Sequence, residues 1–284
     1  MFAGIQHIEI RDNVLGIVFP AAVMYPTNTA SVPTIFGQSF IELSDKAPIS
    51  TGEYPLVVIS HGNGGSHFIY ATICTHLAKQ GYIVAMLEHP GNNYKKNELE
   101  WTPQNLSNRP RHIRDTIDAV AKHPFFIRSV QVDNVAVIGH SLGGYTALAV
   151  AGGKPWSKEG QQIEVEADSR VRALVLLAPA TPWYLPAGSL SNVTVPILML
   201  VAEHDSYTPR WQSDIVLNGV PDKKQVTYRV VENAGHFSFI SPFPLKMRSP
   251  SFLPSTDPGG FDREAFHQKL PSEIGEFLDK ALKK

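Results

Sequence analysis

The sequence has almost no cysteine, no excess of charge of either sign and no long apolar run. Cys74 is the only cysteine in 284 residues, so no disulfide can form within the chain. Lys and Arg number 25 against 26 Asp and Glu, a net charge of −1, which provides no basic face for nucleic acid or an anionic membrane. Apolar runs such as residues 195–202 (VPILMLVA) are far shorter than the roughly 20 residues that span a bilayer. The N-terminal MFAGIQHIEIRDN has no basic region followed by an apolar run, so a cytoplasmic protein is expected.

The composition that remains is typical of a protein with a large apolar core. Hydrophobic residues make up 43% of the chain. Charged residues make up 18%, below the usual value of about 25%. Burial of apolar side chains therefore has to supply the stability, and disorder is not expected.

Short apolar runs alternate with segments of helical periodicity from residue 53 onward. The predicted strands cover residues 56–60, 82–87, 135–138, 171–178, 197–202 and 225–231. The predicted helices cover residues 67–80, 110–122, 142–151, 210–217 and 262–282, with Pro110 in a first turn and a break near Pro271. This alternation predicts an α/β fold with a mostly parallel sheet and helices on both faces.

Residues 1–52 are turn-rich and show no helical pattern, so they are predicted to form antiparallel strands that lead the sheet. We therefore expect a single domain over residues 1–284, with an N-terminal strand extension over 1–52 and the core over 53–284. Three long loops, at residues 88–109, 152–170 and 241–261, are expected to shape a binding site at the carboxyl ends of the strands.

The segment GHSLGG over residues 139–144 follows one predicted strand and opens a helix. A G-x-S-x-G match is weak alone, but a sharp strand-to-helix turn explains why Gly139 and Gly143 flank Ser141. Such a turn exposes the serine hydroxyl above a helix N-terminus, whose N–H groups favour a nearby oxyanion. Ser141 is therefore the predicted nucleophile.

A second glycine-rich turn, HGNGGS over residues 61–66, has neither the phosphate-binding nor the dinucleotide-binding spacing. It fits an oxyanion hole better, and we predict that the backbone N–H groups of Asn63 and Leu142 form it.

A serine nucleophile needs a base and a group that orients the base. Asp205 follows the strand at 197–202, and His236 follows the strand at 225–231, so both are expected at the carboxyl ends of the strands. Glu203 is close enough to take the place of Asp205. Asp168 precedes its strand and belongs at the opposite end of the sheet.

The other histidines and Cys74 have less specific patterns. His61, His89 and His140 are expected to be structural or to line a pocket. The sequence contains no HExxH motif or paired Cys/His spacing, so no metal and no other cofactor are predicted. Cys74 lies on the apolar side of a predicted helix and is expected to pack in the core.

The stretches HGNGG, GHSLGG, EHD and AGHF, in this order, resemble the α/β-hydrolase superfamily. Over residues 50–284 the chain is similar to the bacterial "predicted dienelactone hydrolase" group, which is related to platelet-activating-factor acetylhydrolases. The resemblance implies a serine hydrolase of carboxylic esters with Ser141, His236 and an acid as its triad. Dienelactone hydrolases proper use a cysteine where this chain has Ser141. In mammalian-type acetylhydrolases the acid follows an earlier strand, where residues 178–182 (APATP) here carry no carboxylate, so Asp205 is the acid that fits.

The expected reaction is therefore hydrolysis of small to medium apolar acyl esters by a serine esterase. His140, Trp183, Tyr207 and Phe237 are the predicted substrate-binding residues, since they lie near the triad or past strand ends. The predicted partner is a small-molecule ester; the oligomeric state is open. Two alternatives remain: a lipase-, polyester- or lactone-type hydrolase with the same triad, and a ligand-binding protein on a non-catalytic hydrolase fold.

Overall fold

A computed structural model describes residues 1–283. Its strands form a ten-stranded sheet in the order β10-β9-β8-β7-β5-β6-β2-β1-β4-β3. The strands are β1 (Phe2–Asp12), β2 (Ile17–Thr27), β3 (Val32–Phe36), β4 (Ser39–Asp45), β5 (Tyr54–Ser60), β6 (Ile83–Leu87), β7 (Val130–His140), β8 (Val171–Leu177), β9 (Ile197–Ala202) and β10 (Val226–Val231).

The six strands from β5 to β10 pair in parallel, as the strand–helix alternation predicts. β2 joins this parallel part by antiparallel pairing with β6, and β1 pairs antiparallel with β2. The N-terminal strands therefore extend the same sheet. One pairing differs from the expected antiparallel arrangement, because β4 lies parallel to β1.

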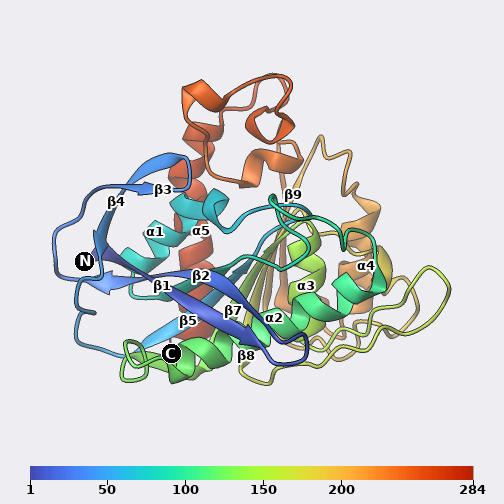
Figure 1. Cartoon of the computed structure of the whole chain (residues 1–284). Coiled ribbons are helices and arrows are strands. Elements are labelled where there is room, and N and C mark those ends of the chain that lie inside the picture. The colour runs from blue at the N-terminus through green and yellow to red at the C-terminus, as the bar shows by residue number, and fades with distance from the viewer. Residues whose placement is uncertain (284) are drawn as a thin grey trace.

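Helices cover both faces of the sheet (Figure 1). They are α1 (Ala71–Lys79), α2 (Pro103–Lys122), α3 (Leu142–Val150), α4 (Trp211–Gly219) and α5 (Arg263–Leu282). The buried side chains of α2, α3 and α4 belong to one apolar cluster, and those of α1 and α5 belong to another on the opposite face. The predicted α/β class with a mostly parallel sheet is confirmed. No helix among residues 1–283 is both long and apolar enough to cross a bilayer.

The predicted start of α2 was wrong. The helix begins at Pro103, where the Thr102 side chain accepts a hydrogen bond from the Asn105 N–H, so Pro110 lies in the helix interior. A proline there leaves the carbonyl four residues earlier without its N–H partner. The Tyr145 hydroxyl donates to that carbonyl, on Leu106, at 3.1 Å. The loop after β6 therefore covers residues 88–102 only.

The predicted break in the last helix was also wrong, because α5 continues through Pro271. Leu270, Ile274 and Leu278 are fully buried against the same apolar cluster as α1. This burial favours a continuous helix despite the missing N–H of the proline. Cys74 is fully buried in that cluster, as expected.

Candidate active site

Ser141 lies at a sharp turn between β7 and α3. Its backbone has φ 55° and ψ −120°, a conformation that residues with a side chain rarely adopt. A Cβ at Gly139 would lie 2.1 Å from the Gly143 carbonyl oxygen, and a Cβ at Gly143 would lie 1.9 Å from the Ser60 carbonyl oxygen. Both flanking positions therefore require glycine, and the turn lies at the carboxyl end of the parallel strands.

Asp205 and His236 come together from the ends of two neighbouring strands. Asp205 follows β9, and His236 opens the short 3₁₀ helix η4 (His236–Phe239) after β10. The His236 Nδ1 atom lies 2.8 Å from Asp205 Oδ2, and both side chains are buried. Asp205 Oδ1 accepts hydrogen bonds from the Tyr207 and Thr208 N–H groups at 2.8 Å each. The Thr208 hydroxyl donates to Oδ2 at 2.7 Å, so the carboxylate is held firmly against the imidazole.

This environment keeps the Asp205 carboxylate ionised. Burial alone would raise the pKa of Asp205, but the hydrogen bond from His236, the positive charge of that ring when protonated, and the donors of Thr208 outweigh burial. The net effect lowers the pKa below its usual value. A carboxylate in this position favours the tautomer of His236 that carries its proton on Nδ1, which leaves Nε2 free to accept a proton.

Ser141 and His236 line the same cavity, which has a volume of about 360 Å³. We call it the carboxyl-end cavity. All the other predicted binding residues line it as well: Asn63, His140, Leu142, Trp183, Tyr207 and Phe237. Within residues 1–283, no hydrogen bond joins the Ser141 hydroxyl to His236, and the bond between a nucleophile and its base commonly tightens only when substrate is bound.

The two predicted oxyanion donors lie on different elements beside Ser141. Asn63 belongs to the loop after β5, and Leu142 is the first residue of α3. Among the hydrogen bonds of the described residues, none uses the backbone N–H of Asn63 or of Leu142. Both donors are therefore available to a ligand in the carboxyl-end cavity.

His140 contacts the backbone of His236, and the two rings lie with their centroids 5.0 Å apart. Burial, together with the neighbouring His236, lowers the pKa of His140 to about 3, so its ring is neutral. Its Nε2 lies 3.0 Å from the His236 carbonyl oxygen, and its Nδ1 lies 3.1 Å from the Tyr70 hydroxyl. A neutral ring satisfies both contacts when Nε2–H donates to the carbonyl and Nδ1 accepts from Tyr70.

The rival acids occupy other places. Glu203 is exposed and accepts a hydrogen bond from the Asn233 N–H at 2.8 Å, so it orients a turn instead of the imidazole. Asp168 pairs with Arg170 at 2.6 Å, before β8. In the part of the chain that the structure describes, no group of three or more His, Cys, Asp or Glu side chains could hold a metal ion.

Sequence reasoning missed the part of the cavity wall formed by Glu100 and Trp101. Trp101 is 73% exposed and adopts φ 62°, at the end of the loop after β6. The Glu100 carboxylate accepts a hydrogen bond from the Asn63 side-chain amide. No motif marks these residues, because only the path of this loop brings them to Asn63.

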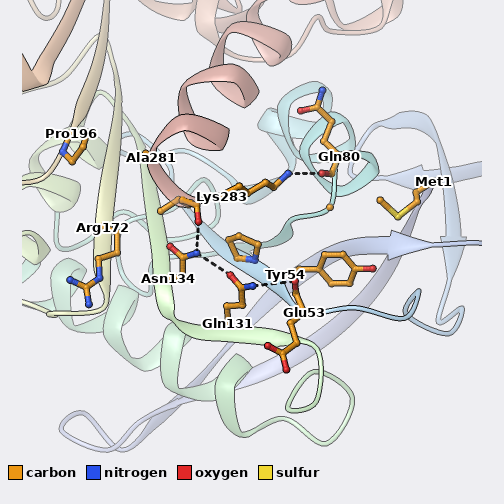
Figure 2. A pocket seen from close by; sticks show the side chains of 13 residues that line it. Met1, Glu53, Tyr54, Gln80, Gln131, Asn134, Arg172, Pro196, Ala281 and Lys283 are labelled. Carbon is orange, nitrogen blue, oxygen red and sulfur yellow. Dashed lines mark hydrogen bonds between the residues drawn. The ribbon is translucent and has the colours of Figure 1, made fainter.

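A larger cavity of about 810 Å³ lies at the opposite end of the strands (Figure 2). We call it the amino-end cavity. Its polar groups form a chain: Lys283 donates to the Gln80 carbonyl, and Asn134 donates to the carbonyl of Leu282 and to the side chain of Gln131. None of its described lining residues is Ser, Cys, His or Asp, so the Ser–His–Asp arrangement predicted from the sequence does not lie there.

Comparison with solved structures shows the class of fold. The chain superimposes on a ferulic acid esterase from Streptomyces cinnamoneus with a TM-score of 0.69 at 18% sequence identity, covering 99% of this chain and 90% of that chain. The protein therefore has the α/β-hydrolase fold that the sequence motifs imply.

Sequence comparisons indicate which members of that class it resembles. A family model described as "Platelet-activating factor acetylhydrolase, isoform II" matches residues 20–100, a range that includes Asn63 and ends before Ser141. A platelet-activating factor acetylhydrolase from Cavia porcellus is 25% identical, covering 60% of this chain and 45% of the relative. The cutinase est1 from Thermobifida alba is 24% identical, covering 67% of this chain and 56% of the relative. The chain thus spans about half the length of these relatives. All these matches are named as ester hydrolases, in agreement with the class of enzyme expected from the sequence.

Proposed function

We propose that the protein is a serine esterase that hydrolyses carboxylic esters of small to medium apolar acyl groups. Ser141 is the nucleophile, His236 the general base and acid, and Asp205 the group that orients His236. The single observation that carries this proposal is the convergence of three strand ends on one cavity. There a serine with a strained backbone lies beside an imidazole that a buried carboxylate holds at 2.8 Å.

The proposed reaction has two halves. His236 Nε2 takes the Ser141 proton as the hydroxyl attacks the ester carbonyl carbon, and the N–H groups of Asn63 and Leu142 bind the negative oxygen. The bond to the leaving alkoxide breaks, His236 donates its proton to that oxygen, and an acyl-enzyme remains on Ser141. Water then attacks the acyl-enzyme with His236 again as base, which releases the acid and restores the serine.

The cavity supports a preference for compact apolar esters. Its volume of about 360 Å³ lies near the lower end of the ~300–1,000 Å³ typical of small-molecule sites. Trp183, Tyr207 and Phe237 supply apolar walls, and none of the described lining residues is Lys or Arg. We assign substrate contact to these three residues and to His140. The names of the relatives, which denote hydrolysis of acetyl, cutin and ferulic acid esters, agree with this reaction class.

A fluorophosphonate probe tests the proposal directly. The native protein should be labelled and Ser141→Ala should not, because the probe bonds only to an activated serine. Hydrolysis of p-nitrophenyl esters from acetate to laurate should be fastest for short or medium chains. Failure of the native protein to be labelled at Ser141 would favour a non-catalytic ligand-binding protein. A rate maximum at the longest chains would favour a lipase- or polyester-type hydrolase.

A further inference from the structure

Among residues 1–283, Arg109 is the largest of the fully buried side chains. It lies on α2, and its guanidinium donates hydrogen bonds to groups on several other elements. Among the described residues, no aspartate or glutamate pairs with it. Burial lowers the pKa of Arg109 to about 9, which still leaves it charged at neutral pH. Burying a cation among neutral acceptors is unfavourable by itself, so the contacts it makes need an explanation.

One side of the guanidinium holds α3, the helix that begins with the predicted donor Leu142. Arg109 Nε donates to the Thr146 hydroxyl oxygen at 3.0 Å. That hydroxyl in turn donates to the Leu142 carbonyl oxygen at 3.1 Å. Two hydrogen bonds thus connect Arg109 to the first turn of α3.

The other side holds the loop that carries the predicted donor Asn63. Arg109 Nη2 donates to the His61 carbonyl oxygen, and to the Ser60 hydroxyl at 3.2 Å. Arg109 Nη1 donates to Asn92 Oδ1 at 2.6 Å, and the Asn92 amide donates to Asn63 Oδ1 at 2.7 Å. The guanidinium therefore holds Asn63 in two ways. It bonds directly to the backbone of His61, two residues before Asn63, and it bonds through Asn92 to the side chain of Asn63.

The planar fork of an arginine suits this task. An oxyanion hole made of two N–H groups works only if both point at one oxygen, and here the two groups lie on separate elements. A guanidinium has N–H groups fixed in one plane, so its donors fix the acceptors relative to one another. A lysine has three donors on a flexible chain and cannot impose the same spacing.

We propose that Arg109 is a positioning residue that sets the spacing between the N–H groups of Asn63 and Leu142, an inference that rests on the proposed esterase function. Arg109 does not line the carboxyl-end cavity, so it acts through these two residues and not on the substrate.

The test compares substitutions at Arg109 itself with a substitution at Thr146, the residue through which Arg109 bonds to α3. Arg109→Met removes every hydrogen bond of the guanidinium. We expect kcat to fall about 10²-fold, the order seen when a catalytic group is misplaced by about 1 Å, and KM to change less than about threefold. Arg109→Lys should lose about tenfold, since charge remains but the fixed geometry does not. Thr146→Val keeps the shape of the side chain and removes the two hydrogen bonds that connect Arg109 to α3, while the bonds of Arg109 to the loop of Asn63 remain, so a loss of about fivefold is expected.

Thr116→Val is the matched control. Thr116 is a buried helical threonine whose hydroxyl donates to the carbonyl four residues earlier, on His112, at 2.6 Å, as Thr146 does to Leu142. None of the hydrogen bonds of Arg109 goes to Thr116. Its kcat should remain within about twofold of the native value.

A thionoester separates misplacement of the donors from loss of folded protein. Replacing the carbonyl oxygen of the substrate by sulfur weakens its hydrogen bonds to the two N–H groups, so the native protein should strongly prefer the oxygen ester. Arg109→Met, Arg109→Lys and Thr146→Val should reduce that preference, whereas a smaller folded fraction lowers both rates equally. An unchanged preference in Arg109→Lys and Thr146→Val would overturn the positioning role, even if Arg109→Met does not fold. Absence of Ser141-dependent hydrolysis in the native protein would instead overturn the proposed function.

Discussion

The carboxyl-end and amino-end cavities lie at opposite ends of the same parallel strands, and they differ more in chemistry than in size. The amino-end cavity has about 810 Å³ against about 360 Å³. Its polar groups are half-buried or exposed, as Asn134 and Arg172 are, and Asn134 holds the C-terminal end of α5 by an ordinary hydrogen bond to the Leu282 carbonyl (Figure 2). The carboxyl-end cavity is backed by buried polar groups that include His61, His140 and Arg109. Cavity volume alone would therefore select the end of the sheet opposite the proposed active site.

The largest expected effect concerns the acid at the carboxyl end. Asp205→Asn should lower kcat by about 10³–10⁴-fold, because an amide favours the wrong tautomer of His236. Steady-state kinetics with a p-nitrophenyl ester measures the loss. Glu203→Gln is the control, and it should stay within about twofold, since Glu203 is exposed and contacts only a turn. A larger loss in Glu203→Gln than in Asp205→Asn would move the acid to the neighbouring position.

The second effect concerns stability in acid. Burial, with the nearby Arg109 charge, holds the pKa values of His61 and His89 well below the usual value near 6.5. These rings stay neutral in the folded protein and gain protons on unfolding below pH 6.5. The free energy of unfolding should therefore fall as pH drops from 7 to 5, by up to about 1 kcal/mol per pH unit for each such ring.

Urea titrations at several pH values measure this slope. His89→Gln should make the slope shallower, because glutamine takes up no proton, while His61 still contributes. Arg172→Ala, at the amino-end cavity, should leave it unchanged. A pH-independent midpoint between pH 5 and 7 in the native protein would contradict the neutral buried rings.

A third, smaller effect concerns the wall of the carboxyl-end cavity. The Tyr207 ring packs against the His236 ring with centroids 5.0 Å apart, and it is 53% exposed. Tyr207→Ala should lower kcat/KM for medium-chain esters by about tenfold, the order expected from losing an apolar contact of this size. The loss should be smaller for acetate, which reaches less of the wall. Equal losses for all chain lengths would indicate that Tyr207 supports His236 and does not contact the acyl group.

The smallest effect is expected at the amino-end cavity. Arg172→Ala should change ester hydrolysis by less than about twofold, because Arg172 only donates to the Asp133 carbonyl near the surface. The same p-nitrophenyl assay measures it. A tenfold loss there would show that the two ends of the sheet are functionally coupled.

The parallel part of the sheet and the site geometry followed from local patterns. Buried strands appear as short apolar runs, and a glycine on each side of Ser141 is required by clashes that any Cβ would create. Parallel strands have their carboxyl ends at the same edge of a sheet, so residues that directly follow neighbouring strands are expected to lie close together. Asp205 and His236 do so at 2.8 Å.

The errors have equally local causes. Pro110 predicts a helix start because a proline ring is favoured in the first turn, but Thr102 caps the helix and Pro103 is its first residue. The Leu106 carbonyl instead accepts a hydrogen bond from Tyr145, which is 39 residues further along the chain. No sequence window reveals such a partner.

Arg109 was missed for a related reason. An arginine on an amphipathic helix is normally exposed to water. Here its partners come from the end of β5, from α3 and from the loop after β6, and only the folded chain assembles them. Tertiary contacts of buried charges are the part of a site that sequence patterns do not encode.

The positive φ at residue 141 implies that catalysis and thermal stability favour different residues at this position: catalysis needs the serine hydroxyl, and stability favours glycine. Glycine would relax the turn, while alanine would keep the unfavourable backbone without the hydroxyl. Ser141→Gly should therefore melt at a higher temperature than Ser141→Ala, by the equivalent of about 1 kcal/mol, after allowance for the greater freedom of glycine when unfolded. Differential scanning calorimetry of the two variants, which both lack the hydroxyl, would measure how much stability the protein loses by keeping a side chain at this position.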